Sequence, residues 1–309
     1  MRERWTPRLD SALVALVLVT AAALLCSLSV AAATSAAALG HKQGKARKAS
    51  APVSGIYDAC AYSDPLNMPL PGCDDRLRAM RRGGFSVVLN YSSEGMSIDE
   101  NLAYARGAAS LGMKVIWNLA NYASYPLDQK LDLVGVTASH RATWGYYIGD
   151  EHPENLPQIA EVSAAVRSMS NRPLLYVSRP NPSKLRPFMG MADYVGPDIY
   201  PVGPIDRASV CRTARWASKI VKPNLTMVLQ AFSWSIDYPN LSPQWPSAAQ
   251  MREMRNQATR CGRPKLLLWF CFHCITAYHP HPDGYWRRLV WAANGRRLGP
   301  KYRFSSIAL

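Results

Sequence analysis

The sequence lacks several signatures that would assign it to a functional class. The first apolar segment after residue 52 runs into 55-GIYDACAYSDP-65, which is not the glycine-rich phosphate loop of a doubly wound nucleotide-binding fold. That segment also has no His-x-His pair, which argues against a metal-dependent phosphodiesterase or amidohydrolase. Acidic residues are few, with 21 Asp and Glu against 36 Lys and Arg. What the chain does contain is therefore more informative than any single fingerprint.

The formal net charge of +15 raises nucleic acid as a partner, but no basic run is interleaved with a recognition motif. We therefore expect no nucleic-acid partner. Two interpretations of the charge stay open. The first is an ordinary solvated basic surface, and the second is attraction to an anionic cell envelope or acidic polymer.

The first 33 residues consist of a basic segment, then an apolar segment, and then a short run of small residues. Arg2, Arg4 and Arg8 precede an apolar run that ends near Ala33, which predicts a secretory signal peptide. An uncleaved membrane anchor is the alternative, because about 20 apolar residues are enough to span a bilayer. Residues 34–52 are polar and basic without an apolar period, which predicts a disordered linker. The expected location is secreted or at the cell surface.

Six cysteines follow the leader, and an even number in an exported chain favours disulfides. Pairing of neighbours along the sequence predicts Cys60–Cys73, Cys211–Cys261 and Cys271–Cys274, although six cysteines allow other connectivities. A metal site at 271-CFHC-274 is the rival interpretation. No second cluster of ligands at metal spacing accompanies it, and we expect no metal and no cofactor.

Short apolar segments alternate with longer amphipathic ones along the rest of the chain. The expected strands are 53–60, 85–92, 114–121, 143–151, 173–180, 192–201, 225–234 and 265–274. The expected helices are 74–82, 98–112, 127–141, 155–170, 183–190, 204–220, 246–262 and 284–296. Strand followed by helix eight times over about 240 residues predicts a single α/β domain, a (β/α)8 TIM barrel, over residues 53–300, with a C-terminal tail at 301–309.

Polar residues gather where these strands end, and in such barrels the chemistry sits at the carboxyl ends of the strands. Seven of the eight ends carry them. They are Asp58, Asn90 with Tyr91 and Glu94, Asn118 with Asn121, Asp150 with Glu151, Asp198 with Tyr200, Gln230 with Trp234, and Trp269 with His273. The opposite strand ends show no such concentration, so we expect a site at the carboxyl end of the barrel.

The fourth strand, within 144-WGYYIGDEHPEN-155, ends in adjacent carboxylates. Side chains alternate along a strand, and the glycines are expected on the inner face of the barrel. On that alternation Glu151 points into the mouth and Asp150 points sideways. The same rule places Asp198 and Tyr200 in the mouth.

These residues resemble the (β/α)8 glycoside hydrolases: a Trp- and Tyr-rich fourth strand ending in Asp-Glu, a sixth ending 198-DIYP-201, and tryptophans after strands seven and eight. The resemblance covers the chain after residue 52 and identifies no single family. It implies that Glu151 is the general acid/base. The nucleophilic glutamate at the end of strand seven in the large retaining clan is replaced here by Gln230, which cannot ionise.

The resemblance therefore leaves two functions open. The first is an exported hydrolase of glycosidic bonds in a poly- or oligosaccharide, with Glu151, Asp150 and Asp198 as catalytic residues. A hexosaminidase-like variant, in which Asp150 orients a substrate acetamido group, needs no enzyme nucleophile. The second is a non-catalytic carbohydrate-binding barrel. In either case the expected sugar-binding residues are Asp58, Asn90, Tyr91, Asn118, Tyr200, Gln230, Trp234 and Trp269.

Overall fold

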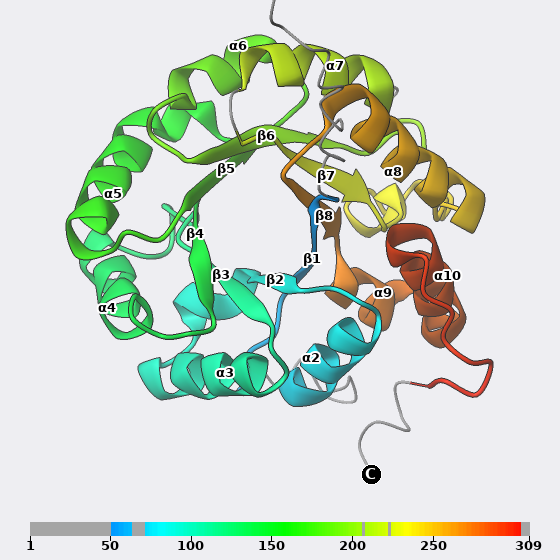
Figure 1. Cartoon of the computed structure of the whole chain (residues 1–309), viewed down its shortest axis with the longest axis horizontal. Coiled ribbons are helices and arrows are strands. Elements are labelled where there is room, and N and C mark those ends of the chain that lie inside the picture. The colour runs from blue at the N-terminus through cyan, green and yellow to red at the C-terminus, as the bar shows by residue number, and fades with distance from the viewer. Residues whose placement is uncertain (1–50, 64–71, 206–207, 222–223, 304–309) are drawn as a thin grey trace, which may run out of the picture. The chain divides into compact units, whose positions relative to one another are not determined.

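The protein folds as a closed barrel of eight parallel strands, seen in the computed structural model of residues 51–63, 72–205, 208–221 and 224–303 (Figure 1). The strands are β1 (Val53–Asp58), β2 (Val87–Asn90), β3 (Lys114–Asn118), β4 (Thr143–Asp150), β5 (Leu174–Ser178), β6 (Tyr194–Ile199), β7 (Thr226–Gln230) and β8 (Leu266–Phe270). Each strand pairs with the next in sequence, and β8 pairs with β1. The predicted (β/α)8 barrel is confirmed.

Helices surround the barrel (Figure 1). They are α2 (Cys73–Arg82), α3 (Ile98–Ser110), α4 (Leu127–Thr137), α5 (Leu156–Met169), α6 (Pro182–Leu185), α7 (Val210–Ile220), α8 (Ala248–Gly262), α9 (Phe272–Tyr278) and α10 (Pro282–Asn294). Short 3-10 turns are η2 (Tyr91–Gly95), η3 (Pro153–Asn155), η4 (Arg186–Phe188) and η5 (Trp234–Ile236). Ser97 and Ser247 begin α3 and α8 as capping boxes, which satisfy backbone N–H groups that the first helical turn leaves unpaired.

Alternation along the strands builds two apolar layers. Side chains on one face fill the barrel, and those on the other pack beneath the helices. In β8, for example, Leu266 and Leu268 lie inside the barrel, whereas Leu267 and Trp269 belong to the outer layer. The barrel interior is therefore a packed core, and a site can open only at its ends.

Several expected boundaries were wrong, among them the end of the eighth strand and the start of the helix before the seventh strand. The eighth strand was expected to reach residue 274, but it ends at Phe270 and the chain turns into α9. The helix expected over 204–220 begins only at Val210. Apolar residues continue past the end of β8, so hydrophobicity alone does not mark the change from strand to helix.

The predicted signal peptide and nearly all of the predicted linker lie outside the described residues, as does most of the C-terminal tail. The question of an N-terminal membrane anchor falls on that part of the chain. Within the described ranges, no helix combines the length and apolar character needed to cross a membrane.

The structure contains the three disulfides that neighbour pairing predicts. Cys60–Cys73 joins the segment after β1 to the start of α2, and Cys211–Cys261 joins α7 to α8. Cys271–Cys274 closes a short loop at the start of α9. Each crosslink lies at or between the helices that cover the barrel.

A buried ion pair ties β1 to α2. Arg76 Nη1 donates to Asp58 Oδ1 at 3.0 Å, and neither side chain is exposed. The same guanidinium nitrogen donates to the carbonyl oxygen of Ala59 at 3.0 Å. Removing one partner of such a pair leaves an uncompensated buried charge, which costs about 3–5 kcal/mol.

Replacing Arg76 with Met should therefore lower the free energy of unfolding by about 3–5 kcal/mol, measured by urea denaturation. Arg81→Met is the matched control, because Arg81 is exposed on the same helix, and it should change the stability by less than about 0.5 kcal/mol. Equal losses of unfolding free energy in the two variants would show that the buried ion pair contributes no more to stability than an exposed arginine does.

Candidate active site

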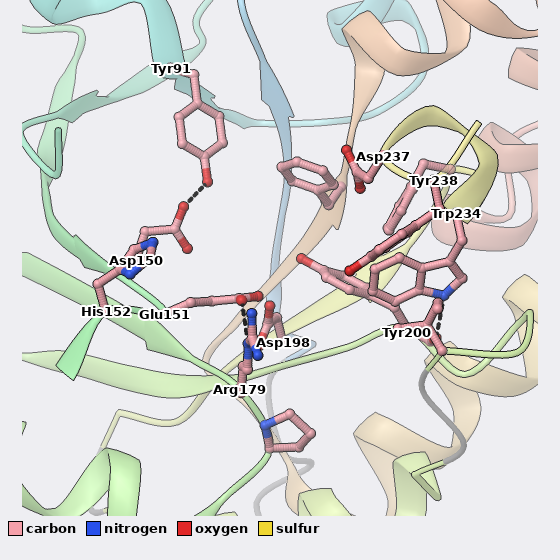
Figure 2. A pocket seen from close by; sticks show the side chains of 14 residues that line it. Tyr91, Asp150, Glu151, His152, Arg179, Asp198, Tyr200, Trp234, Asp237 and Tyr238 are labelled. Carbon is pink, nitrogen blue, oxygen red and sulfur yellow. Dashed lines mark hydrogen bonds and ion pairs between the residues drawn. The ribbon is translucent and has the colours of Figure 1, made fainter. Parts of the chain in front are cut away.

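A cavity of about 490 Å³ opens at the carboxyl ends of the strands (Figure 2). Residues from the ends of β4, β5, β6 and β8, and from the segments after β2 and β7, form its wall. They are Tyr91, Asp150, Glu151, His152, Arg179, Pro180, Asp198, Tyr200, Ile205, Phe232, Trp234, Asp237, Tyr238 and Phe270. Four carboxyl groups and a cluster of aromatic rings thus share one open space.

An irregularity in β4 turns Asp150 toward the cavity. The pairing of β4 with β5 shifts register between Tyr147 and Gly149, so one extra residue is accommodated in β4. Gly149 then faces the helix layer beside Tyr176, and Asp150 pairs with Val177, whose side chain lies inside the barrel. The expectation that Asp150 points sideways was wrong, because a bulge reverses the alternation of side chains.

Glu151 reaches the same cavity by a different route. Its backbone has φ of 50°, a left-handed conformation that costs an L-residue about 1–2 kcal/mol. Its amide donates to the carbonyl oxygen of Val177 at 3.1 Å, which fixes this turn against β5. The side chain is 26% exposed and lines the cavity. A strained residue held this firmly is a frequent feature of functional sites.

Arg179 holds the carboxylate of Glu151. Its Nε donates to Glu151 Oε2 at 2.7 Å, while 75% of the arginine side chain stays exposed. Burial opposes the ionisation of Glu151, but hydrogen bonds from Asp198 and Arg179 and the charge of Arg179 keep its pKa below the usual value. Glu151 is therefore ionised at neutral pH.

Asp198 lies deeper, with only 3% of its surface exposed. Its carboxyl group shares a hydrogen bond with that of Glu151, and Figure 2 shows both side chains at the cavity. Burial, that hydrogen bond and the negative charges of Glu151 and Asp150 raise the pKa of Asp198 well above its usual value. When the Glu151–Asp198 pair holds one proton, these shifts favour its position on Asp198.

Arg179 thus separates the two groups: its charge helps to lower the pKa of Glu151, whereas the pKa of Asp198 is raised.

Tyr91 anchors Asp150. The hydroxyl group of Tyr91 donates to Asp150 Oδ2 at 2.5 Å. Burial raises the pKa of Asp150 above its usual value, against the opposing effect of this hydrogen bond. Tyr91 is itself fixed from below, because Asn118 Nδ2 donates to its carbonyl oxygen at 3.1 Å and to Glu94 Oε2 at 2.9 Å. Lys130 forms a buried ion pair with Glu94.

An aromatic wall faces the carboxyl groups. The rings of Tyr200, Phe232, Trp234 and Phe270 contact one another at centroid distances of 5.0–5.9 Å. Tyr238 extends this wall outward and is 47% exposed. Aromatic faces of this kind pack against the apolar C–H faces of flat ligands.

Six of the residues expected in the site line the cavity: Asp150, Glu151, Asp198, Tyr91, Tyr200 and Trp234. Asp58, Asn90, Asn118, Gln230 and Trp269 do not line it. All five are buried and contact other parts of the fold. The strand-end pattern therefore predicted the correct end of the barrel, but these five residues support the cavity and do not line it.

Each of these five has a physical reason for its position. Asp58 pairs with Arg76, as described above. Asn90 exchanges two hydrogen bonds with the backbone of Cys60, at 3.0 and 2.9 Å. Trp269 packs beneath the helices, because Leu268 and Phe270 take the inward positions of β8. A side chain buried in that outer layer cannot stack on a ligand.

Gln230 clamps two loops together. Its Oε1 accepts from the amide of Val202 at 2.7 Å, and its Nε2 donates to the carbonyl oxygen of Val202 at 2.8 Å. Trp234 Nε1 adds a bond to the carbonyl oxygen of Tyr200 at 3.3 Å. The amide at the end of β7 is therefore part of the scaffold that fixes the cavity rim.

Sequence reasoning missed several cavity residues, among them Arg179, Asp237 and Tyr238. Arg179 directly follows β5, the one strand end at which no polar residue had been singled out. Asp237 and Tyr238 lie in 234-WSIDY-238, seven and eight residues beyond β7. The combination of aromatic and acidic residues in that loop was the available signal.

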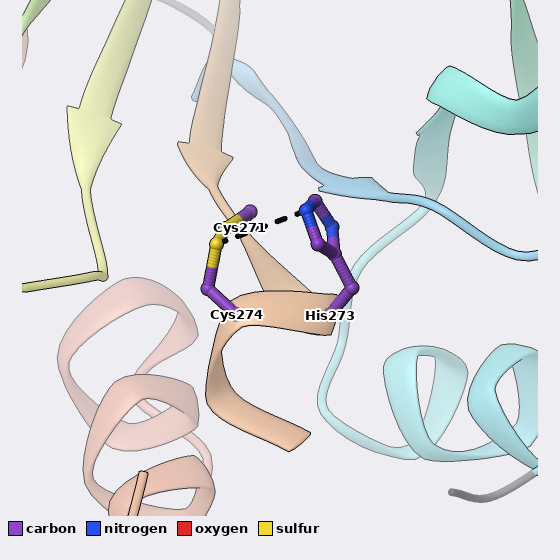
Figure 3. A group of neighbouring side chains, drawn as sticks. All are labelled: Cys271, His273 and Cys274. Atoms are coloured by element: carbon purple, nitrogen blue, oxygen red, sulfur yellow. Dashed lines mark hydrogen bonds between the residues drawn. A yellow bond between two sulfur atoms is a disulfide. The ribbon is translucent and has the colours of Figure 1, made fainter. Parts of the chain in front are cut away.

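The two cysteines of the candidate metal motif at residues 271–274 are oxidised. Cys271 and Cys274 form a disulfide, and His273 Nε2 lies 3.8 Å from the sulfur of Cys274 (Figure 3). The ligand atoms of the three residues lie within 4.8 Å of one another. Because both sulfur atoms are bonded to each other, neither is the thiolate that a metal ion requires. Burial lowers the pKa of His273 to about 4, so its ring is neutral.

No family model matches this chain, and no curated protein matches it in sequence. Solved structures share its fold. The GH99 endo-α-mannosidase of Bacteroides thetaiotaomicron aligns over 79% of this chain and 96% of its own, with a TM-score of 0.57 and 11% identity. The spore cortex-lytic enzyme SleL of Bacillus cereus aligns over 79% and 74%, with a TM-score of 0.53 and 12% identity.

A glycosyl hydrolase family 2 member from Bacteroides cellulosilyticus aligns over 78% of this chain, with a TM-score of 0.54 and 13% identity. This chain spans only 32% of that protein's length. The barrel is thus similar to those of many glycoside hydrolases, and at these identities the similarity shows the fold alone.

The ion pair between Arg179 and Glu151 can be tested without a substrate. Replacing Arg179 with Gln should raise the pKa of Glu151, because the cation that stabilises its ionised form is lost. Carboxyl 13C NMR titration measures that pKa directly. Arg260→Gln, on an exposed face of α8, should leave it unchanged. An unaltered titration in Arg179→Gln would mean that the ion pair does not set the charge of Glu151.

Proposed function

We propose that this chain is an exported carbohydrate-active hydrolase that cleaves glycosidic bonds of a poly- or oligosaccharide. One observation carries the proposal: an open cavity brings together Glu151 and Asp198, whose pKa values are shifted in opposite directions, and places them opposite an aromatic wall. Glycoside hydrolysis requires a carboxyl group that donates a proton to the leaving oxygen. Export is supported by the basic, apolar and small-residue order of the first 33 residues and by the disulfides.

In this mechanism the Glu151–Asp198 pair acts as one acid. Asp198 stores the proton, and Glu151, which reaches into the cavity, delivers it to the glycosidic oxygen as Asp198 ionises. The positive charge of Arg179 compensates the negative charge that the pair carries. Asp150, fixed by Tyr91, orients the substrate beside the reacting bond.

The aromatic wall defines the class of ligand. Trp234 and Tyr238 offer partly exposed ring faces on which sugar rings stack, and the carboxyl groups accept hydrogen bonds from sugar hydroxyls. The net charge of +15 supports a location at an anionic cell envelope. Envelope glycans, including amino-sugar polymers such as peptidoglycan, therefore belong among the first substrates to test.

A non-catalytic carbohydrate-binding barrel is the second candidate. The ion pair between Glu151 and Arg179 favours it, because a carboxylate stabilised by a guanidinium is a weaker proton acceptor. The same cavity and aromatic wall would then bind a glycan without cleaving it.

Glu151→Gln and Asp198→Asn should each reduce kcat by about 10²–10⁴-fold with little change in glycan binding, because the first removes the group that delivers the proton and the second removes the group that holds it. Product release from mannan, xylan, β-glucan, chitin and peptidoglycan, with calorimetric binding to the same glycans, measures both effects. Glu154→Gln is the matched control, since Glu154 is 65% exposed and lies outside the cavity.

Wild-type rates in Glu151→Gln would remove this residue from the mechanism. Binding without cleavage by the wild-type protein would establish the non-catalytic alternative.

The rate should also depend on pH in both directions. Below the lowered pKa of Glu151 the pair gains a second proton, and above the raised pKa of Asp198 it loses its only one. Hydrolysis should therefore be fastest between these two values, since only there does the pair hold one proton. A profile of kcat/KM against pH checks this, and a rate that rises steadily through the alkaline range would contradict it.

A further inference from the structure

Asp237 is a fourth carboxyl group in the cavity wall, and it stands apart from the others. It follows η5 in the segment between β7 and α8, whereas Asp150 ends β4 and Glu151 directly follows that strand. In the closed ring, β5 and β6 separate β4 from β7, so these carboxyl groups approach the cavity from different sides. Figure 2 shows Asp237 beside Tyr238, on the opposite side of the view from Asp150 and Glu151.

Asp237 also differs from Asp150 and Glu151 in its bonding partners. Asp150 is bound by Tyr91, and Glu151 is bound by Arg179. Within the described ranges, the carboxylate of Asp237 has no hydrogen-bond or ion-pair partner, and the residue is exposed. Partial burial and the charge of Glu151 raise the pKa of Asp237 above its usual value, which brings its basicity closer to that of a useful proton acceptor.

The reaction needs such a group because Glu151 and Asp198 cannot fill both catalytic roles. Two carboxyl groups that flank a glycosidic bond lie about 5–5.5 Å apart in retaining enzymes and about 6.5–9.5 Å apart in inverting ones. Glu151 and Asp198 are within hydrogen-bonding reach of each other, which leaves no room for a sugar or a water molecule between them. They act as one group, and the second must come from another wall.

We propose that Asp237 is the second catalytic carboxylate, a general base that activates water for an inverting displacement; this inference rests on the proposed hydrolysis. Asp237 takes a proton from water, and the water oxygen bonds to the anomeric carbon. The bond from that carbon to the leaving oxygen breaks, its electron pair stays on the oxygen, and the Glu151–Asp198 pair supplies the proton. Exchange with solvent then returns one proton to the pair and removes one from Asp237.

The test uses Asp237→Ala in the full chain, on whichever glycan of the panel the wild-type protein cleaves. The variant should lose about 10²–10⁴-fold in kcat with little change in KM. Sodium azide, which needs no deprotonation to attack, should restore part of the rate, an effect that a merely structural role would not produce. The wild-type product should show inverted anomeric configuration by proton NMR.

Asp132→Ala is the matched control, because Asp132 is exposed on α4 and lies outside the cavity. Its kcat and its response to azide should match those of the wild-type protein. Thermal unfolding of both variants checks that the fold is intact, which the exposed position of Asp237 favours.

Three results would overturn the assignment: near wild-type activity in Asp237→Ala, a loss that azide does not restore, or a wild-type product of retained configuration. The fate of the proposed function is read separately. If Glu151→Gln abolishes cleavage while Asp237→Ala does not, the hydrolase stands and the role of Asp237 falls. If the wild-type protein binds glycans but cleaves none, both fall together.

Discussion

Two carboxyl groups within hydrogen-bonding reach cannot both ionise in a partly desolvated cavity without a large electrostatic cost, and this constraint governs the site. The barrel places Asp198 near the carboxyl end of β6, where it is buried, and the left-handed turn at Glu151 brings a second carboxyl group against it. Arg179 then decides which of the two carries the negative charge. The raised pKa of Asp198 is thus a consequence of where β4, β5 and β6 end.

The support for this arrangement lies beneath the cavity floor. Tyr91 holds Asp150, Asn118 holds the backbone of Tyr91, and the buried pair of Glu94 and Lys130 holds Asn118. Of these supporting groups, Asn118 was expected to contact a ligand, because polar residues at strand ends are typical of active sites. It does not line the cavity and instead donates hydrogen bonds to Tyr91 and Glu94, since a buried polar group without a partner is costly.

The sequence predicted the barrel because eight apolar segments of strand length alternate with amphipathic helices, a pattern that few other folds produce. Asp198 could be placed for the same reason, since β6 keeps a regular alternation. Asp150 could not, because Tyr146, Tyr147 and Ile148 are all apolar and an inserted residue among them leaves the hydrophobic pattern unchanged. Asp237 was missed because long loops carry no periodicity from which a direction can be inferred.

The bonds of Gln230 to Val202 and of Trp234 to Tyr200 join the loops after β6 and β7 into one unit. Neither loop can change its length or its path without losing partners in the other. Natural variation in ligand preference among related chains would then be inherited as paired changes in both loops. The barrel below could stay constant while this two-loop module is exchanged as a block.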